Sequence, residues 1–250
     1  MEAEVDPDVR WVAELAGRGR SSAERAVREA SEERRLFAHL RKEHRAEGRM
    51  SYVEIDAPLE LHALVRLLRP WHVVEVGVSS GVSSAYVLHA LGKNGRGTLH
   101  SVDLPSRPRR SGGRATTASW SVPPGRSTGW AVPFPLRARW DLRLGDKADV
   151  VPLLVRELPR IDLLVYDVPH NERDLDREFG ALDRRMRAGA VAIVDHGPGG
   201  GLCAALRRWA RRRQGIPLRR QGLGLYGTRL GPRTGPSRRV ARRASMRRDA

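Results

Sequence analysis

The chain has 250 residues, of which 40% are apolar, as expected for one α/β domain with extensions. Its net charge of +17 lies mainly at one end, because from Leu206 onward fifteen arginines accompany a single aspartate. The remaining residues are nearly balanced in charge, which argues against a nucleic-acid substrate, although the arginine-rich end leaves RNA or DNA open.

No run of about 18 apolar residues occurs, so the sequence predicts no membrane-spanning helix. The first residues are acidic and polar, unlike the basic and apolar start of a signal peptide. Cys203 is the single cysteine, which excludes an intrachain disulfide and suits a reducing compartment. We therefore expect a cytoplasmic protein, and the oligomeric state, a homo-oligomer included, stays open.

Residues 1–57 form an expected N-terminal helical extension. Apolar residues recur at helical spacing from residue 8 to residue 47, with a break near Gly17 and an N-cap at Ser21 or Ser22. Pro58 then opens a further helix that reaches Leu68. The main domain is expected to span residues 58–230.

Strands and helices alternate through this domain. We expect strands at 72–76, 97–102, 140–144, 161–166, 190–194, 216–219 and 223–230, with helices at 82–93, 148–157, 172–186 and 202–213. Several strands are continuous apolar runs, which is typical of a parallel sheet covered on both faces. The predicted fold class is therefore α/β, with a Rossmann-like, mostly parallel sheet.

Two segments do not fit this alternation. Residues 104–137 are rich in Pro, Gly, Ser and Arg, and are too long for a plain connection. They are expected either to be disordered or to form a lid over a site. Residues 231–250 have almost no apolar content and are expected to be a disordered basic tail.

The strongest motif begins in the first expected strand, where Glu75 is followed by Gly77 and Gly81 and then by a helix. Gly77 permits a tight turn, and Gly81 lets a ligand approach the helix closely. The N-terminus of the helix attracts an anionic group, and Ser83 adds a hydroxyl there. A strand, a glycine loop and a helix in this order indicate a nucleotide-like cofactor.

Acidic residues end the next two strands. Asp103 stands where the acid of nucleotide-binding βαβ units binds ribose hydroxyls. Asp146 ends the third strand, where a carboxylate can accept a hydrogen bond from an adenine amino group. The first three strands thus end at matching positions, which strengthens the prediction of a cofactor site at the carboxyl edge of the sheet.

On these motifs the stretch from about Tyr52 to Leu230 resembles class I S-adenosylmethionine (SAM)-dependent methyltransferases. Within that class it is similar to the small-molecule O-methyltransferases, which include catechol O-methyltransferase and a group from bacterial secondary metabolism. The resemblance implies a seven-stranded sheet with an antiparallel last strand, and it places the methionine carboxylate at Ser83. It also implies the cofactor-binding residues Glu75, Gly77, Val78, Gly81, Val82, Ser83, Asp103, Leu104, Asp146, Lys147 and Asp167.

The residues of the reacting centre are expected at the carboxyl ends of the fourth and fifth strands. Asp167 ends one of them and His170 follows, where the resembling enzymes place their base. Asp195 and His196 end the other. The resemblance places a divalent metal on Asp167, Asp195 and His196, but an imidazole suits zinc, iron or nickel better than magnesium, so metal dependence stays open.

The function indicated by these residues is methyl transfer from SAM to an oxygen of a small-molecule acceptor, with His170 and Asp167 as catalytic residues. Two other interpretations stay open. One is an RNA or protein methyltransferase that docks through the arginine-rich tail, and the other is a non-catalytic protein with a SAM-binding fold. A dehydrogenase fits less well because its glycine spacing differs.

Overall fold

The computed structural model describes residues 7–46, 57–105, 122–123, 125–169, 171–196 and 200–233. Its centre is a seven-stranded sheet in the order β3-β2-β1-β4-β5-β7-β6. The strands are β1 (His72–Val76), β2 (Thr98–Asp103), β3 (Trp140–Leu144), β4 (Ile161–Tyr166), β5 (Met186–Asp195), β6 (Leu218–Arg219) and β7 (Leu225–Arg229). Strands β1 to β5 pair in parallel, and β7 is antiparallel to its neighbours, which confirms the predicted fold class.

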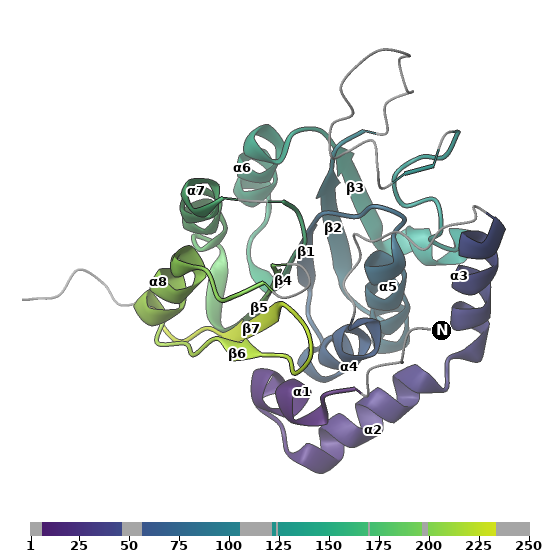
Figure 1. Ribbon diagram of the computed structural model, residues 1–250, viewed down its shortest axis with the longest axis horizontal. Coiled ribbons are helices and arrows are strands. Elements are labelled where there is room, and N and C mark those ends of the chain that lie inside the picture. The colour runs from purple at the N-terminus through teal and green to yellow at the C-terminus, as the bar shows by residue number, and fades with distance from the viewer. Residues whose placement is uncertain are drawn as a thin grey trace, which may run out of the picture.

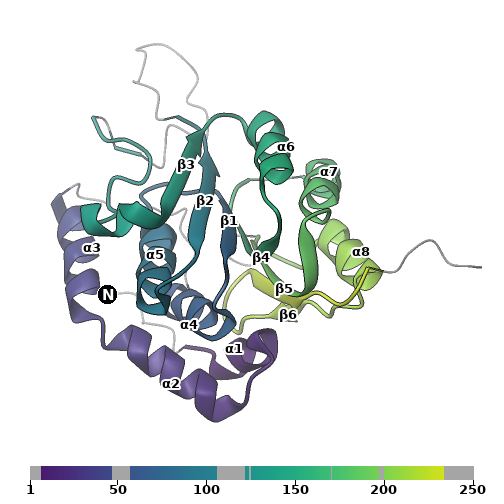
Figure 2. The same cartoon turned by 180° about the vertical axis from the view of Figure 1, so that it is seen from behind.

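Helices cover both faces of the sheet (Figures 1 and 2). They are α1 (Val9–Ala16), α2 (Arg20–Ser31), α3 (Arg34–Ala46), α4 (Pro58–Leu68), α5 (Val82–Asn94), η2 (Phe134–Arg139), α6 (Lys147–Glu157), α7 (Glu172–Leu182) and α8 (Ala204–Arg212). Helices α4 and α5 lie on one face with α1 to α3 outside them, and α6, α7 and α8 lie on the other.

The alternation of side chains along the strands produces two hydrophobic cores. Val73 and Leu163 point into the core beneath α4 and α5, which also takes apolar residues from α1 to α3. Val74 and Leu164, one residue further along each strand, point into the core beneath α6 to α8. A sheet buried on both faces explains why its strands read as nearly continuous apolar runs.

The N-terminal extension belongs to the first of these cores. The Trp11 indole donates a hydrogen bond to the carbonyl oxygen of Leu218 at 2.9 Å. Glu60 of α4 and Arg220, both almost fully buried, form an ion pair of 2.7 Å.

The predicted N-cap at Ser21 or Ser22 is wrong: α2 begins at Arg20 after Gly19, which has an extended conformation.

One predicted boundary is also wrong. The apolar spacing of Leu175, Phe179 and Leu182 continues to Met186, so the sequence predicts one helix over 172–186. In the structure α7 ends at Leu182, and Met186 begins β5, where it pairs with Ile161 of β4. Sheet pairing therefore overrides the helical periodicity at its last position.

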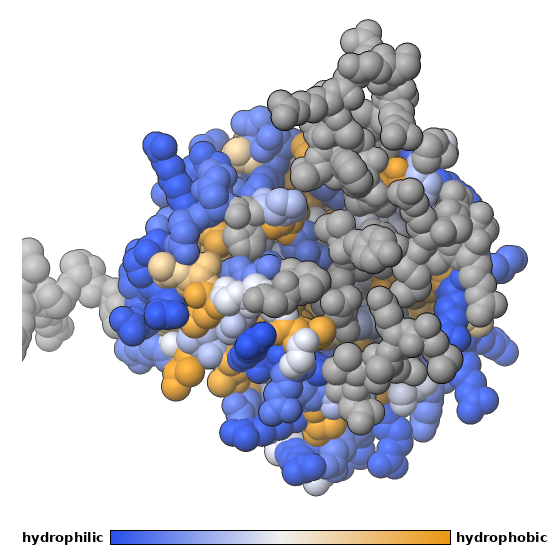
Figure 3. Space-filling view, viewed as in Figure 1, coloured by the Kyte–Doolittle hydropathy of each residue, from blue (hydrophilic) through white to orange (hydrophobic). Residues whose placement is uncertain are grey.

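Hydrophilic side chains dominate the rim of the view in Figure 3, and apolar side chains lie between them in small separate areas. None of the helices in the described part of the chain is long and apolar enough to cross a membrane.

Of the predicted basic tail, the structure describes only the first residues, as far as Arg233. Its first residues pack on the domain, because Arg213 donates to the carbonyl oxygen of Gly231 at 3.1 Å.

Candidate functional site

The predicted site residues lie at the carboxyl edge of the sheet, where β1, β2, β4 and β5 end side by side. Val76 of β1 pairs with Val102 of β2 and with Tyr166 of β4. The loops that follow these strands therefore start at the same level. The backbone N–H of Asp167 donates to the carbonyl oxygen of Val76 at 2.8 Å, which holds the loop after β4 against the loop after β1.

The two glycines of the loop after β1 serve close packing. Gly77 has a φ of +98°, and an added Cβ would lie 1.9 Å from the carbonyl oxygen of Asp167. Gly81 has a φ of +92°, and its Cβ would lie 2.5 Å from a methyl group of Val132. We expected Gly81 to admit a ligand, but in the structure the segment around Val132 occupies that side of it.

Glu75 is fully buried beneath this loop. Its carboxylate accepts hydrogen bonds from the hydroxyls of Ser83 and Ser84 at 2.7 Å each, and from Ser101 at 2.6 Å. Trp140 in turn donates to the Ser101 hydroxyl at 2.8 Å. Burial raises the pKa of Glu75, and the three hydroxyls oppose that shift. Glu75 therefore joins β1, β2 and the first turn of α5.

The Ser83 hydroxyl, which the resemblance assigned to the methionine carboxylate, donates to Glu75 in this structure. Helix α5 begins directly after Gly81 without a side-chain cap. The first turn of α5 therefore offers its backbone N–H groups and the helix dipole to an anionic group. This arrangement suits a carboxylate with or without the Ser83 hydroxyl.

Asp103 ends β2, and its carboxylate faces the loop after β1. One oxygen accepts the N–H groups of Val78 and Ser79 at 2.9 and 2.8 Å, and the other accepts the N–H of Leu104 at 2.7 Å. A carboxylate offers about four acceptor positions. Three are occupied, so this conformation leaves about one position for a ribose hydroxyl, rather than the two that the motif predicts.

The described end of the 104–137 segment packs on the loop after β1. Residues 127–132, the bridging segment, donate two backbone hydrogen bonds to that loop. Gly129 N–H donates to the carbonyl oxygen of Ser79, and Ala131 N–H donates to that of Ser80, both at 2.9 Å. These contacts could not be predicted from local sequence patterns, because the partners are about 50 residues apart. Residues 106–121, which belong to the predicted lid, lie outside the described residues.

Asp146 and Lys147, at the start of α6, were predicted to bind the cofactor, and in this structure both contact other residues of the protein. The Asp146 carboxylate caps α6 by accepting the N–H of Ala148 at 2.8 Å. The ammonium group of Lys147 lies 2.8 Å from the Tyr166 hydroxyl and 3.1 Å from the Glu178 carboxylate. Glu178 is buried in α7 and needs a cationic partner, so Lys147 turns toward α7 instead of toward the glycine loop.

The proposed reacting centre is only partly described. Asp167 directly follows β4 and Asp195 is the last residue of β5, and the two positions match because Tyr166 pairs with Val194. The His196 ring packs edge-on against Tyr226, with ring centroids 5.5 Å apart. His170 lies outside the described residues, so the structure does not test its role as a base.

The residues proposed as metal ligands do not fit a metal centre in this structure. Asp167, Asp195 and His196 all belong to the described part of the chain. Within that part, no group of three or more His, Cys, Asp or Glu side chains converges as metal ligands would.

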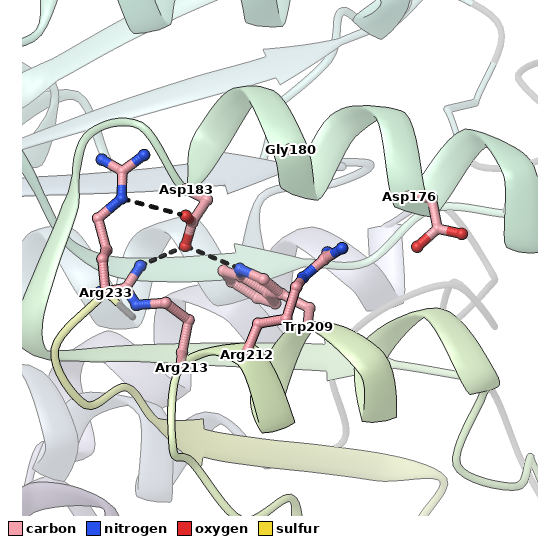
Figure 4. A pocket seen from close by; sticks show the side chains of 7 residues that line it. All are labelled: Asp176, Gly180, Asp183, Trp209, Arg212, Arg213 and Arg233. Carbon is pink, nitrogen blue, oxygen red and sulfur yellow. Dashed lines mark hydrogen bonds and ion pairs between the residues drawn. The ribbon is translucent and has the colours of Figure 1, made fainter. Parts of the chain in front are cut away.

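A cavity of about 340 Å³ lies away from this edge, between α7 and α8 (Figure 4). Asp183 stands at its centre and accepts the Trp209 indole N–H at 2.8 Å. Arg213 and Arg233 form ion pairs with the same carboxylate. These contacts attach the C-terminal helix to α7, and we assign the cavity a structural role.

Comparison with known proteins agrees with this geometry. Residues 74–196, about half of the chain, match a family described as a methyltransferase domain. The matched range runs from β1 through the glycine loop to the end of β5. No curated protein sequence matches the chain.

Solved structures share the fold at low sequence identity. An O-methyltransferase from Bacillus cereus in complex with S-adenosylhomocysteine (SAH) is 14% identical, with a TM-score of 0.52 over 78% of this chain and 90% of that one. A methyltransferase from Geobacter sulfurreducens is 18% identical, with a TM-score of 0.52 and the same two shares. An SAH-bound methyltransferase from Podospora anserina is 13% identical, with a TM-score of 0.50 over 78% of this chain and 87% of that one.

The matched domain, the seven-stranded sheet with β7 antiparallel and the glycine loop beside Asp103 agree with one another. Residues 74–196 therefore form a methyltransferase domain, and the fold is the Rossmann-like one of class I SAM-dependent methyltransferases.

Proposed function

We propose that the enzyme transfers the methyl group of SAM to an oxygen atom of a small-molecule acceptor. The observation that carries this proposal is the carboxyl edge itself, where Asp103, the loop Gly77–Gly81 and the N-terminus of α5 lie together. The similarity to an O-methyltransferase in complex with SAH supports the choice of donor and of acceptor atom. SAM supplies an activated methyl group when it is bound.

The residues of this chain bind and orient the two reactants. Asp103 would accept a ribose hydroxyl, and the N–H groups of the first turn of α5 would bind the carboxylate of the cofactor. During the transfer a carbon–oxygen bond forms as the carbon–sulfur bond breaks, and the acceptor hydroxyl gives up its proton. We propose that His170 takes this proton and that Asp167, at the end of β4, orients the acceptor or the base.

Nucleic acid is the alternative acceptor, because of the arginines near the C-terminus. Several of these arginines already have acidic partners in the structure. Arg208 pairs with Glu172 and Asp176, and Arg213 pairs with Asp183. These pairs offset part of the positive charge on and beside α8, whereas the tail beyond Arg233 lies outside the described residues. Binding of a labelled RNA with and without residues 234–250, measured against salt concentration, tests the alternative.

The experiment that tests the proposed function uses methyl-labelled SAM and a mixture of small hydroxylated metabolites. We expect mass spectrometry to find a product that has gained one labelled methyl group on oxygen, together with SAH. A protein that binds SAM but forms no methylated product with any acceptor would match the non-catalytic interpretation instead. A cytoplasmic location, a role in secondary metabolism and the oligomeric state stay predictions.

A further inference from the structure

The backbone of Ser79 is strained and is held from both sides. Its φ is +52°, a left-handed conformation that non-glycine residues seldom adopt. The N–H of Ser79 donates to Asp103 at 2.8 Å, and its carbonyl oxygen accepts the N–H of Gly129 at 2.9 Å. The bridging segment therefore helps to maintain the conformation that points the loop N–H groups toward Asp103.

The bridging segment also reaches the second loop of the cofactor site. The Thr128 hydroxyl donates to the carbonyl oxygen of Leu104 at 3.1 Å, directly after Asp103. Thr128 is only 4% exposed, so its side chain is packed within the domain while it makes this contact. One short segment thus holds the loop after β1 and the loop after β2 relative to each other.

The shape of the segment depends on a glycine. Gly129 has a φ of +71°, and an added Cβ would lie 2.2 Å from the six-membered ring of Trp140. Arg137 donates to the carbonyl oxygens of Gly129 and Val132, at 3.2 and 3.1 Å. A side chain at position 129 would push the segment away from Trp140 and disturb its hydrogen bonds to the loop.

The outer side of the segment rests on α3. His39 lies 3.2 Å from the carbonyl oxygen of Ala131, to which its ring N–H donates. Arg126, just before the segment, faces Glu43 at 3.8 Å. The bridging segment is therefore packed between the N-terminal extension and the glycine loop.

We infer that the bridging segment is a positioning element of the cofactor site, which holds the loop Gly77–Gly81 and the loop after Asp103 in their binding conformation. Thr128 and Gly129 are its key positioning residues, and they act on the cofactor through Ser79 and Leu104. The inference rests on the proposed use of SAM for its binding readout, and a second readout needs no ligand.

The first test compares Gly129→Ala with Gly125→Ala. Both glycines have a positive φ, but a Cβ on Gly125 meets nothing within 4 Å, so the control introduces similar backbone strain without the clash. We expect Gly129→Ala to weaken SAH binding, measured by titration calorimetry, at least about tenfold, and Gly125→Ala to change it less than about twofold. Equal effects of the two substitutions would overturn the inference.

A milder pair guards against misfolding of Gly129→Ala. Thr128→Val removes the hydroxyl with little change of shape, whereas Thr128→Ser keeps it. We expect a several-fold loss of SAH affinity in Thr128→Val and near wild-type affinity in Thr128→Ser. A lowered melting temperature with unchanged affinity in Thr128→Val would show that the segment only stabilises the fold.

Hydrogen exchange on the ligand-free proteins separates this inference from the proposed function. We expect Thr128→Val to speed amide exchange in residues 77–81 and at Leu104, while exchange in α7 and α8 stays unchanged. Faster exchange there supports the inference even if the wild-type protein binds no SAH, a result that would refute only the proposed cofactor. Unchanged exchange in both loops would overturn the inference.

Discussion

Asp103 accepts the backbone N–H of Ser79 at 2.8 Å, and Ser79 has the left-handed backbone conformation expected of a glycine. The carboxylate thus stabilises a strained turn before any ligand arrives. The residue predicted to bind ribose therefore also holds the loop that is proposed to bind the rest of the cofactor.

We expect Asp103→Ala to weaken SAM binding at least about tenfold, because one charge-assisted hydrogen bond contributes roughly 1.5–3 kcal/mol. Three backbone N–H groups also lose their acceptor, so the melting temperature should fall while far-ultraviolet circular dichroism keeps its shape. Titration calorimetry and thermal unfolding measure the two effects. Unaltered affinity would remove Asp103 from the binding site.

Replacement of Glu75 should destabilise the protein through the buried serines. Without its carboxylate, the hydroxyls of Ser83, Ser84 and Ser101 lose their acceptor. We expect Glu75→Ala to lower the free energy of unfolding by about 1–3 kcal/mol for each hydroxyl left unsatisfied. Glu75→Gln, which keeps one acceptor oxygen, serves as the control. Its free energy of unfolding, measured with urea, should fall by less than that of Glu75→Ala. Equal stability of the two variants would contradict the network.

Stability should decrease in mild acid because of His62. His62 is fully buried in α4, and burial lowers its pKa to about 3. Its Nε2 lies 3.1 Å from Nδ1 of His89, so one ring must donate and the other accept. The unfolded chain binds a proton near pH 6.5 and the folded chain does not, so stability is present above pH 6.5 and decreases as pH falls toward 3.

Through His62, the free energy of unfolding should be about 2 kcal/mol lower at pH 5 than at pH 7. Urea unfolding of wild type and of His62→Leu at both pH values measures it. We expect the variant to show the smaller dependence on pH, and an identical slope in both proteins would mean that His62 does not contribute. Burial also lowers the pKa of His89, so some dependence on pH should remain in the variant.

Arg213 should be essential for attachment of α8. It is 2% exposed and donates to Met186 and Gly231 besides its ion pair with Asp183. Removing one partner of a buried ion pair typically costs about 3–5 kcal/mol. We expect that loss in Arg213→Met and little change in Arg211→Met, an exposed position on the same helix. Similar melting temperatures in both variants would contradict this role.

The catalytic assignment predicts that His170→Ala lowers kcat by about 10² to 10⁴ and leaves SAM affinity nearly intact. Proton transfer to His170 needs no metal, so we expect chelation with EDTA to leave turnover unchanged. Steady-state rates in the presence of EDTA, with and without added divalent ions, provide the control. Loss of turnover on chelation, restored by one metal, would contradict the metal-free mechanism.

Local sequence patterns were sufficient to predict the sheet. His72 to Val76 is an apolar, β-branched run followed by glycines, and Asp103 ends the next predicted strand, so both positions could be predicted from short segments. The antiparallel β7 followed from the resemblance to a family and was confirmed by the structure. Helix ends were harder to predict, as Met186 shows, because tertiary pairing decided them.

The partners of the site residues were less predictable. Nothing near Lys147 in the sequence indicates Glu178, and nothing near Ser79 indicates Gly129, because these contacts depend on the packing of distant segments. One signal was present: Glu75 is a charged residue in the apolar run from Val73 to Val76, and Ser101 lies at a polar position in the next strand. Buried polar groups need partners, so these two could have been expected to pair.

A calorimetric titration of the wild-type protein with SAH tests most directly whether the carboxyl edge of the sheet binds SAM. We expect saturable binding with one site per chain, and no binding of NADH under the same conditions. Absence of SAH binding in the folded protein, or binding of NADH in its place, would contradict the assignment.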